Sequence, residues 1–404
     1  MRACAAAQLH LANTEPRPLN GHIHVEIQMH RRIFWCAYHL DRLVSAAFDL
    51  PVSIPDTAID AKIYANVDDK DLIQVAFATP PGTKLKGSNQ FTEVSPALHI
   101  IQIRRIQSEI LNYTLNCGFA AQFAAQSDWR NWILSELKAW KSQVHHYTEP
   151  GSKGYTSSRW FAIIYHCALL MLYRPTKDNV LGPAGDWSVQ ASTQACLAFR
   201  KSQMDRQVAL PWLALLFQFQ SGITLLYCFW ATPERHRTPN FESSDIWDAL
   251  RACSNTFAIM ADHWPTAECL RDVFELLARG VPLVGRLNRD SQRISPQAVI
   301  QIQSSMPSVR SIVINRSVLR MIEEMITEDF PGADNKSPPL ALDEQPQVQY
   351  TNGSTINGIS HPSCAPLTFE MPFLSDNWQT LYDGGINLQE FGNDTPLFPG
   401  LFDI

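Results

Sequence analysis

The 404-residue sequence lacks the cysteine patterns that mark secreted or metal-binding proteins. Its nine cysteines lie singly along the chain, and no two of them are spaced as Cys-x2-Cys. The closest pair, Cys253 and Cys269, is separated by fifteen residues, so a thiolate zinc site cannot be built locally. An odd number of scattered cysteines, mostly within apolar runs, indicates reduced thiols in an intracellular protein.

Basic residues are missing from the end of the chain. From Ser337 to Ile404 there are eight acidic residues and no Lys or Arg, so this segment alone carries −8. The formal charge of the whole chain is −6, which leaves residues 1–336 near +2. Neither part has the dense Lys/Arg stripe that neutralises a phosphate backbone. We therefore expect this chain not to bind DNA directly.

Signals for membranes and for catalysis are missing as well. The apolar run after Met1 is too short for a signal peptide, and no later stretch reads as the eighteen or so apolar residues of a membrane span. Nucleophile-elbow, dinucleotide-binding and phosphate-loop patterns are absent. The acidic run Asp68–Asp71 lacks the partner cluster of a magnesium pyrophosphate site and is interpreted as a solvated connector. We expect no membrane partner, no metal, no cofactor-binding residue and no catalytic residue, and hence no enzyme.

Helical periodicity is what the sequence does have. Ile33, Ala37, Leu40 and Val44 are spaced 4, 3 and 4 apart with Phe34 and Tyr38 alongside, which predicts a helix with one apolar face that ends at Pro51. The Pro- and Gly-rich residues 51–92 predict a connector with at most short helices. Further helices are predicted at about 95–113, 127–144, 160–173, 186–206, 211–231, 244–263, 265–279 and 307–328, with 160–173 apolar on all sides and hence central. The predicted class is all-α, a multi-helix bundle over residues 1–330.

Residues 331–404 predict a disordered, acidic C-terminal tail. They are rich in Pro, Gly, Asn, Ser and Gln, and aromatic side chains alternate with acidic ones towards the end. Acidic residues keep such a segment solvated while its aromatics dock on a partner, which is typical of activation segments. The alternatives are a plain disordered tail or a segment that packs on the domain. The candidate partner-binding residues are Phe373, Trp378, Tyr382, Phe391 and Phe398.

Four segments carry a family likeness. They are Arg31–Arg42 followed by Pro51–Asp56 and Ile59-Asp60, Tyr165-His166 with Leu172–Pro175, Ser221–Cys228, and Arg271–Glu275. In this order they closely resemble the fungal-specific transcription factor domain, the helical regulatory middle domain of Zn2Cys6 zinc-binuclear-cluster transcription factors. The likeness covers roughly residues 5–280. Ala5–His10 resembles the end of the family helix that precedes the first segment, so we expect the domain to be truncated at its N-terminus.

The resemblance implies a function in the nucleus of a fungus. It implies a regulator of RNA polymerase II genes, for a metabolic or secondary-metabolite pathway, that contacts a coactivator or the transcriptional machinery and pairs as a homodimer or heterodimer. Family members usually carry six cysteines that share two zinc ions, and this chain has no such spacing. Zinc, and with it DNA binding, is therefore expected only if a six-cysteine cluster lies upstream.

Eight residues of the resembling segments are candidates for a site. Four of them, Arg31, Arg32, Asp41 and Arg42, lie beside the apolar face of the first long helix, where a buried charge must be paired to avoid a large desolvation cost. We therefore predict that they form structural ion pairs, with contact to an effector or partner as the alternative. The eight are Arg31, Arg32, Phe34, Trp35, Asp41, Arg42, Arg174 and Pro175.

The sequence leaves two further functions open. A DNA-free partner or inhibitor of a full-length zinc-cluster regulator needs only the helical body. An all-α enzyme for prenyl or lipid substrates is disfavoured, because the paired carboxylate clusters of that chemistry are not found.

Overall fold

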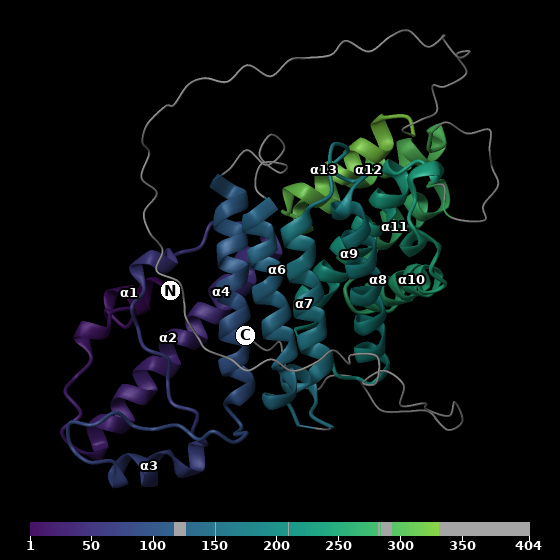
Figure 1. The fold of residues 1–404 in the computed structure, drawn as a ribbon. Helices are drawn as coiled ribbons and strands as arrows, with labels where there is room; N and C mark the ends of the chain where they lie inside the picture. The colour runs from purple at the N-terminus through teal and green to yellow at the C-terminus, as the bar shows by residue number, and fades with distance from the viewer. Residues whose placement is uncertain (117–126, 150, 209, 282, 284–292, 331–404) are drawn as a thin grey trace, which may run out of the picture. The chain divides into compact units, whose positions relative to one another are not determined.

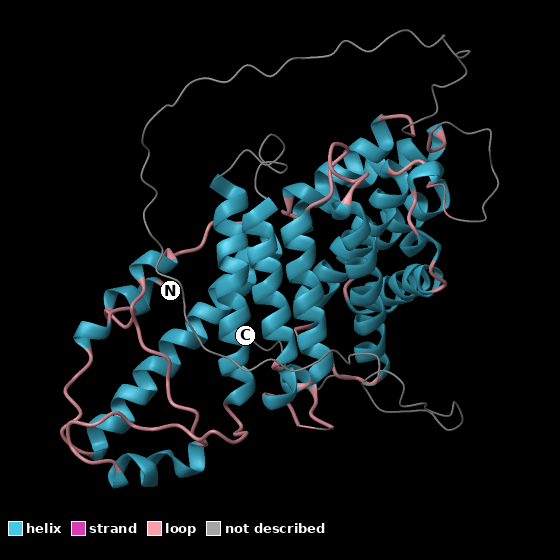
Figure 2. Cartoon of the chain, in the orientation of Figure 1, coloured by secondary structure: helices cyan, strands magenta, loops and turns pink. Residues whose placement is uncertain are grey.

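The computed structural model describes residues 1–116, 127–149, 151–208, 210–281, 283 and 293–330. These residues form twelve α-helices joined by loops and short 3₁₀ turns, and no β-strand occurs among them (Figure 2). The predicted all-α class is therefore confirmed. The described residues belong to one compact unit, Met1–Glu344. The predicted tail, 331–404, lies outside the described residues, so its disorder and the domain boundary near residue 330 stay predictions.

The helices follow one another in the order of the colour ramp in Figure 1. Figure 1 also shows α4, α6 and α7 running alongside one another, and all three pairs are in contact. The bounds are α1 Arg2–Ala6, α2 Gly21–Phe48, α3 Asp69–Ala78, α4 Ser95–Asn116, α6 Ser127–Ser142, α7 Ser158–Tyr173, α8 Pro183–Met204, α9 Pro211–Ala231, α10 Asp245–His263, α11 Glu268–Gly280, α12 Pro296–Ile312 and α13 Arg316–Thr327.

Local capping chemistry sets several of these helix starts. The Asn20 side chain accepts a hydrogen bond from the Ile23 N–H at 3.0 Å, and Ser157 accepts one from Trp160 at 3.1 Å. Both side chains satisfy N–H groups that have no partner within the first turn of a helix. Pro211 occupies the first position of α9, where its missing N–H costs nothing. The predicted start at residue 211 follows from that proline.

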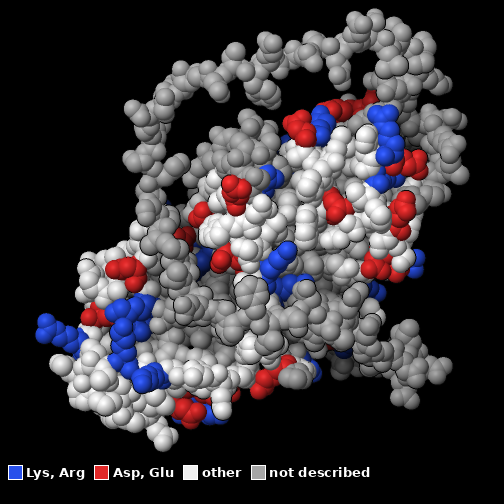
Figure 3. Space-filling view, viewed as in Figure 1, with Lys and Arg blue, Asp and Glu red and all other residues white. Residues whose placement is uncertain are grey.

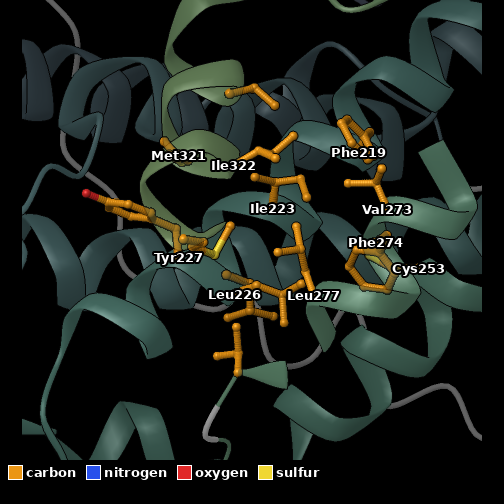
Figure 4. Packing of buried hydrophobic residues seen from close by; sticks show 14 of the residues in the cluster. Phe219, Ile223, Leu226, Tyr227, Cys253, Val273, Phe274, Leu277, Met321 and Ile322 are labelled. Carbon is orange, nitrogen blue, oxygen red and sulfur yellow. The ribbon is translucent and has the colours of Figure 1, made fainter. Parts of the chain in front are cut away.

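The core centres on α9. Every residue from Ser221 to Ala231 is buried, and helices α8, α10, α11 and α13 contact it. Figure 4 shows Phe219, Ile223 and Leu226 of α9 meeting Phe274 and Leu277 of α11 and Ile322 of α13. α9 is long and apolar enough to cross a membrane, contrary to the expectation that no run is, but 83% of its most apolar window is buried within the protein. Its composition is explained by packing against other helices.

The last predicted helix, 307–328, is two helices in the structure. α12 already begins at Pro296, and Pro307 lies inside it rather than at its start. Asn315 then starts α13, because its side-chain oxygen accepts hydrogen bonds from the N–H groups of Ser317 and Val318 at 3.1 and 3.2 Å. Val318 and Ile322 are buried, so the predicted apolar side of this segment is correct and its predicted boundaries are wrong.

The apolar face predicted for the first long helix is only half correct. α2 buries Phe34, Trp35 and Tyr38, but it exposes Ile33 by 49% and Leu40 by 55%. Apolar residues occur on two faces of α2, and the face with three aromatic rings offers more surface to bury. That face also brings the charged Arg42 into the interior, where its side chain is 1% exposed.

Candidate functional site

A buried charge network around Arg42 organises the N-terminal half of the described chain. The guanidinium of Arg42 donates to an Asp41 carboxylate oxygen at 2.8 Å, to Asp56 at 3.1 Å and to the Ile54 carbonyl oxygen at 2.7 Å. Its Nε donates to Ser108 Oγ of α4 at 3.2 Å, and its Cζ lies 4.1 Å from the centroid of the Tyr38 ring. One side chain of α2 therefore joins the connector at residues 54–56 to α4.

The two carboxylates of this network are each satisfied several times. Asp56 accepts hydrogen bonds from the Tyr38 hydroxyl at 2.6 Å, from Arg42 and from the Ser108 hydroxyl. Asp41 accepts from Arg42 and from both the N–H and the hydroxyl of Ser53. Burial, and next the negative charge of Asp56, raise the pKa of Tyr38 above its ordinary value, so its hydroxyl stays a donor. Such a fully connected network stabilises one arrangement of its helices.

Arg31, Arg32 and Trp35 attach the segment 59–69 to α2. Arg31 donates to the Ile63 carbonyl oxygen at 3.3 Å and makes two parallel hydrogen bonds to Glu15 at 2.6 and 2.7 Å. Arg32 pairs with Asp69 at the start of α3 and donates to the Val67 carbonyl oxygen at 2.8 Å. The Trp35 indole N–H donates to the Lys62 carbonyl oxygen at 3.0 Å. Phe34 is fully buried in the same cluster.

Arg174 and Pro175 lie where three helices meet. Arg174 closes the end of α7 and makes two hydrogen bonds to Asp49, which closes the end of α2, at 3.0 and 2.5 Å. The Pro175 carbonyl oxygen accepts a hydrogen bond from Arg320 of α13 at 2.9 Å. Segments that are far apart in the sequence are therefore connected directly.

The structure pairs each of the four charged motif residues on α2, and Arg174 as well, within the protein. Whether they also contact an effector or a partner stays a prediction. The aromatic tail residues, Phe373, Trp378, Tyr382, Phe391 and Phe398, lie outside the described residues. The partners Glu15, Asp49, Asp69 and Ser108 were not predicted from the sequence. Asp56 was included only as part of a resembling segment, because a carboxylate fourteen residues from Arg42 cannot be matched to it from spacing.

Arg104 of α4 is a buried cation of a different kind. Its Nε lies 3.4 Å from His39 Nδ1 and its Nη1 lies 2.5 Å from Gln107 Oε1, while its Nη2 has no partner among the described residues. Burial lowers the pKa of Arg104 to about 10, and burial together with the Arg104 charge lowers the pKa of His39 to about 3. Arg104 thus remains charged at neutral pH and His39 accepts its hydrogen bond as a neutral ring.

A cavity of about 490 Å³ lies between α12 and α13. Its charged walls are already paired, Arg310 with Glu323 at 2.6 Å and Arg320 with Glu324 at 2.9 Å. The hydroxyl of Tyr227 on α9 donates to Glu324 at 2.5 Å. These contacts hold α13 against the core.

The described residues do not fit a zinc cluster. Among them, no three His, Cys, Asp or Glu side chains come together as a metal site would require. The seven cysteines described as free are spread over different helices, and five of them are buried.

The fold and this network define an all-helical domain in which buried ion pairs, formed by residues distant in sequence, position the first long helix. Residues 4–142 match the family described as the fungal specific transcription factor domain. The family likeness predicted from the sequence is confirmed over these residues.

Curated relatives are named as fungal regulators. The chain is 27% identical over 205 residues to pyrimidine pathway regulatory protein 1 of Saccharomyces cerevisiae, covering 50% of this chain and 22% of the relative. It is 23% identical over 296 residues to the positive regulator of purine utilization of Emericella nidulans, covering 62% and 27%. It is 24% identical over 166 residues to the transcriptional activator protein acu-15 of Neurospora crassa, covering 39% and 17%. The chain thus spans about a quarter of the first two relatives or less, and no solved structure matches it.

Proposed function

We propose that the chain belongs to a nuclear regulator of RNA polymerase II transcription that controls metabolic genes in a fungus. The observation that carries the proposal is the domain match at residues 4–142, which includes the ion-paired helix α2 and its neighbour α4. The relatives are named for pyrimidine, purine and acu-15 regulation, which supports small-molecule metabolism as the field of control. No catalytic step is part of this function.

Deletion of the gene in the fungus that encodes it tests this proposal. We expect a limited set of metabolic transcripts to change, and a fluorescently tagged chain to concentrate in the nucleus. An unchanged transcript profile under several carbon and nitrogen sources, or a tagged chain excluded from the nucleus, would contradict it.

Direct DNA contact is not assigned to these 404 residues, and zinc is expected only through a cysteine cluster upstream of them. Chromatin immunoprecipitation of the tagged chain, with and without a co-expressed full-length relative, distinguishes a regulator from a DNA-free partner or inhibitor. The partner protein would be recruited only when the full-length regulator is present. Reading the genomic frame upstream of Met1 for six cysteines complements this test.

We further propose that residues 331–404 recruit the transcriptional machinery. The support is compositional, since beyond Lys336 the aromatic side chains alternate with eight acidic ones and there is no basic one. Fused to an unrelated DNA-binding domain, this segment should activate a reporter gene, and changing Phe373, Trp378 and Phe391 to Ala should abolish the activation. A fusion of equal expression that does not activate would refute the assignment.

A further inference from the structure

Helix α2 carries apolar side chains on its exposed side as well as on its buried side. Its buried side carries His24, Gln28 and Arg42 beside the aromatic residues. Its exposed residues all lie along one line, which we call the α2 seam: His22, Glu26, Met29, Ile33, Cys36, Leu40 and Val44. Met29, Ile33, Leu40 and Val44 are exposed by 43, 49, 55 and 42%, whereas the solvent face of a surface helix is normally polar.

The spacing of the α2 seam is that of a helix-pairing surface. From His22 to Leu40 the exposed positions are alternately four and three residues apart, the 3.5-residue period at which one helix meets another along its length. This stretch extends for about 27 Å at 1.5 Å per residue. A small ligand needs a concave site, whereas a straight apolar line of this length fits a second helix.

The seam can pair with a copy of itself only in one direction. In a parallel pair Glu26 would face Glu26 at a core position, which places like charges together. In an antiparallel pair centred on Ile33, Met29 lies level with Ala37 of the other copy, next to Cys36, and Glu26 lies level with Leu40 near the edge. The central layers are then apolar, and the two Glu26 side chains lie far apart.

The surface around the seam is large enough for such a pair. Phe77 of α3 is 55% exposed and its ring lies 4.8 Å from that of His22, and Ile73, one turn earlier, is 63% exposed. Figure 3 shows that the surface over α3 is largely uncharged in this view. Six large apolar side chains that are each about half exposed offer on the order of 600 Å², close to the roughly 800 Å² per partner of a specific interface.

The acid-rich residues 337–404 are a poorer match for this surface. The one formally charged member of the seam is Glu26, and the adjacent Arg32 already pairs with Asp69. The seam itself therefore contains no Lys or Arg for a segment that carries −8, and Lys70 is the one basic residue of α3. We propose that two copies of the chain associate through antiparallel α2 seams centred on Ile33.

Light scattering coupled to size exclusion tests the association with the full chain. Over a wide concentration series the wild type should pass from monomer to dimer, and the Ile33→Glu/Leu40→Glu variant should raise the dimer dissociation constant at least roughly hundredfold, because four carboxylates would enter the interface. Since both positions are exposed, the thermal unfolding transition should not move at a concentration at which the wild type is monomeric. Ile300→Glu, at an isoleucine of α12 that is 66% exposed, is the matched control and should leave the dimer intact. A monomeric wild type, or a dimer that the double variant does not weaken, would overturn the proposal.

Disulfide trapping tests the direction. An antiparallel pair places two copies of residue 33 at the symmetry axis, whereas the two Cys36 residues are offset by about 9 Å along the helices in addition to their lateral separation. With copper phenanthroline and dioxygen as oxidant, Ile33→Cys/Cys36→Ser should give a covalent dimer on a non-reducing gel and the wild type should not. Cross-linking of wild-type Cys36 that is lost in Cys36→Ser would show the parallel arrangement and overturn the proposal.

Discussion

Arg174 and Asp49 each end a helix, and their side chains form an ion pair with each other. Asp49 ends α2 with φ of 56° and Arg174 ends α7 with φ of 34°, so both residues occupy the left-handed region that costs a non-glycine residue roughly 1–2 kcal/mol. Their side chains are 7 and 15% exposed and are joined by two parallel hydrogen bonds. The ion pair therefore offsets backbone strain at both ends.

Asp49→Ala should lower the free energy of unfolding by about 2–4 kcal/mol, because it leaves a largely buried guanidinium without its carboxylate. Arg174→Lys should cost about 1–2 kcal/mol, since an ammonium cannot make the two parallel bonds. Urea denaturation measures both. Asp49→Gly, which loses the pair but relieves the left-handed strain, should be about 1 kcal/mol more stable than Asp49→Ala. Equal stability of these two variants would show that the backbone at residue 49 is not strained.

A comparison of Arg42 with Arg104 tests how much a buried guanidinium contributes to the free energy of unfolding. Arg42→Met leaves Asp41 and Asp56 without their cation and should destabilise the fold by about 3–5 kcal/mol. Arg104→Met removes a buried cation that contacts His39 and Gln107 but no carboxylate among the described residues, so the change should be within about 1 kcal/mol of zero. Chemical denaturation of the two variants side by side decides this. A loss at Arg104 as large as that at Arg42 would mean that Arg104 has an anionic partner.

His99 predicts an acid sensitivity of the fold. Its ring stacks between Trp140 at 4.4 Å and Tyr147 at 4.3 Å, and burial lowers its pKa to about 3. The unfolded chain binds a proton at His99 below about pH 6.5 and the folded chain does not, so stability falls as the pH falls from about 6.5 towards 3. Between pH 7.5 and 5.5 this residue should remove about 1.4 kcal/mol.

The variant His99→Phe keeps the stacking and removes the titration. Its unfolding free energy, measured in urea at pH 7.5 and 5.5, should therefore change less with pH than that of the wild type by about 1.4 kcal/mol. His145→Phe, at an exposed histidine, serves as the control and should retain the wild-type dependence. Parallel pH curves for the wild type and His99→Phe would be incompatible with a neutral, buried His99.

Gly222 allows α9 to approach α10 and α11. A Cβ atom there would lie 2.8 Å from Phe274 Cε2 and 3.1 Å from Cys253 Sγ, both of which are buried. Gly222→Ala should therefore destabilise the protein by about 1–3 kcal/mol through overpacking. Gly182→Ala is the control, because its nearest neighbour is 3.7 Å away, and its melting temperature should stay close to that of the wild type. A Gly222→Ala variant as stable as this control would argue against the close approach.

The sequence predicted helices well where one local signal dominates. Pro211 starts α9, Ser158–Tyr173 is apolar on all sides, and the stripe Ile133, Leu137 and Trp140 of α6 is buried as predicted. Prediction of the last helix was wrong at its start, because a proline inside α12 resembles a helix start and the cap at Asn315 needs three-dimensional geometry.

Prediction of α2 was limited by a different cause. Periodicity identifies the apolar faces of a helix but does not show which of two such faces is buried. In α2 the buried face depends on contacts of Arg42 with Asp56 and Ser108, which lie elsewhere in the fold. The same holds for Arg174, since nothing in the spacing connects it with Asp49, 125 residues earlier. The sequence therefore predicts that the charged residues form ion pairs, but it does not predict which distant residues are their partners.

The long sequence separation between α2 and Arg174 matters during translation. At about 5–20 residues per second, the synthesis of Arg174 follows that of the last residue of α2 by roughly 6–25 seconds. Until then its aromatic side lacks the helices that will cover it and its other side carries the α2 seam, so the nascent helix exposes apolar side chains on two sides. The early chain should therefore depend on chaperones more than its final stability would suggest, and a ribosome-bound fragment ending near residue 100 should be captured by them.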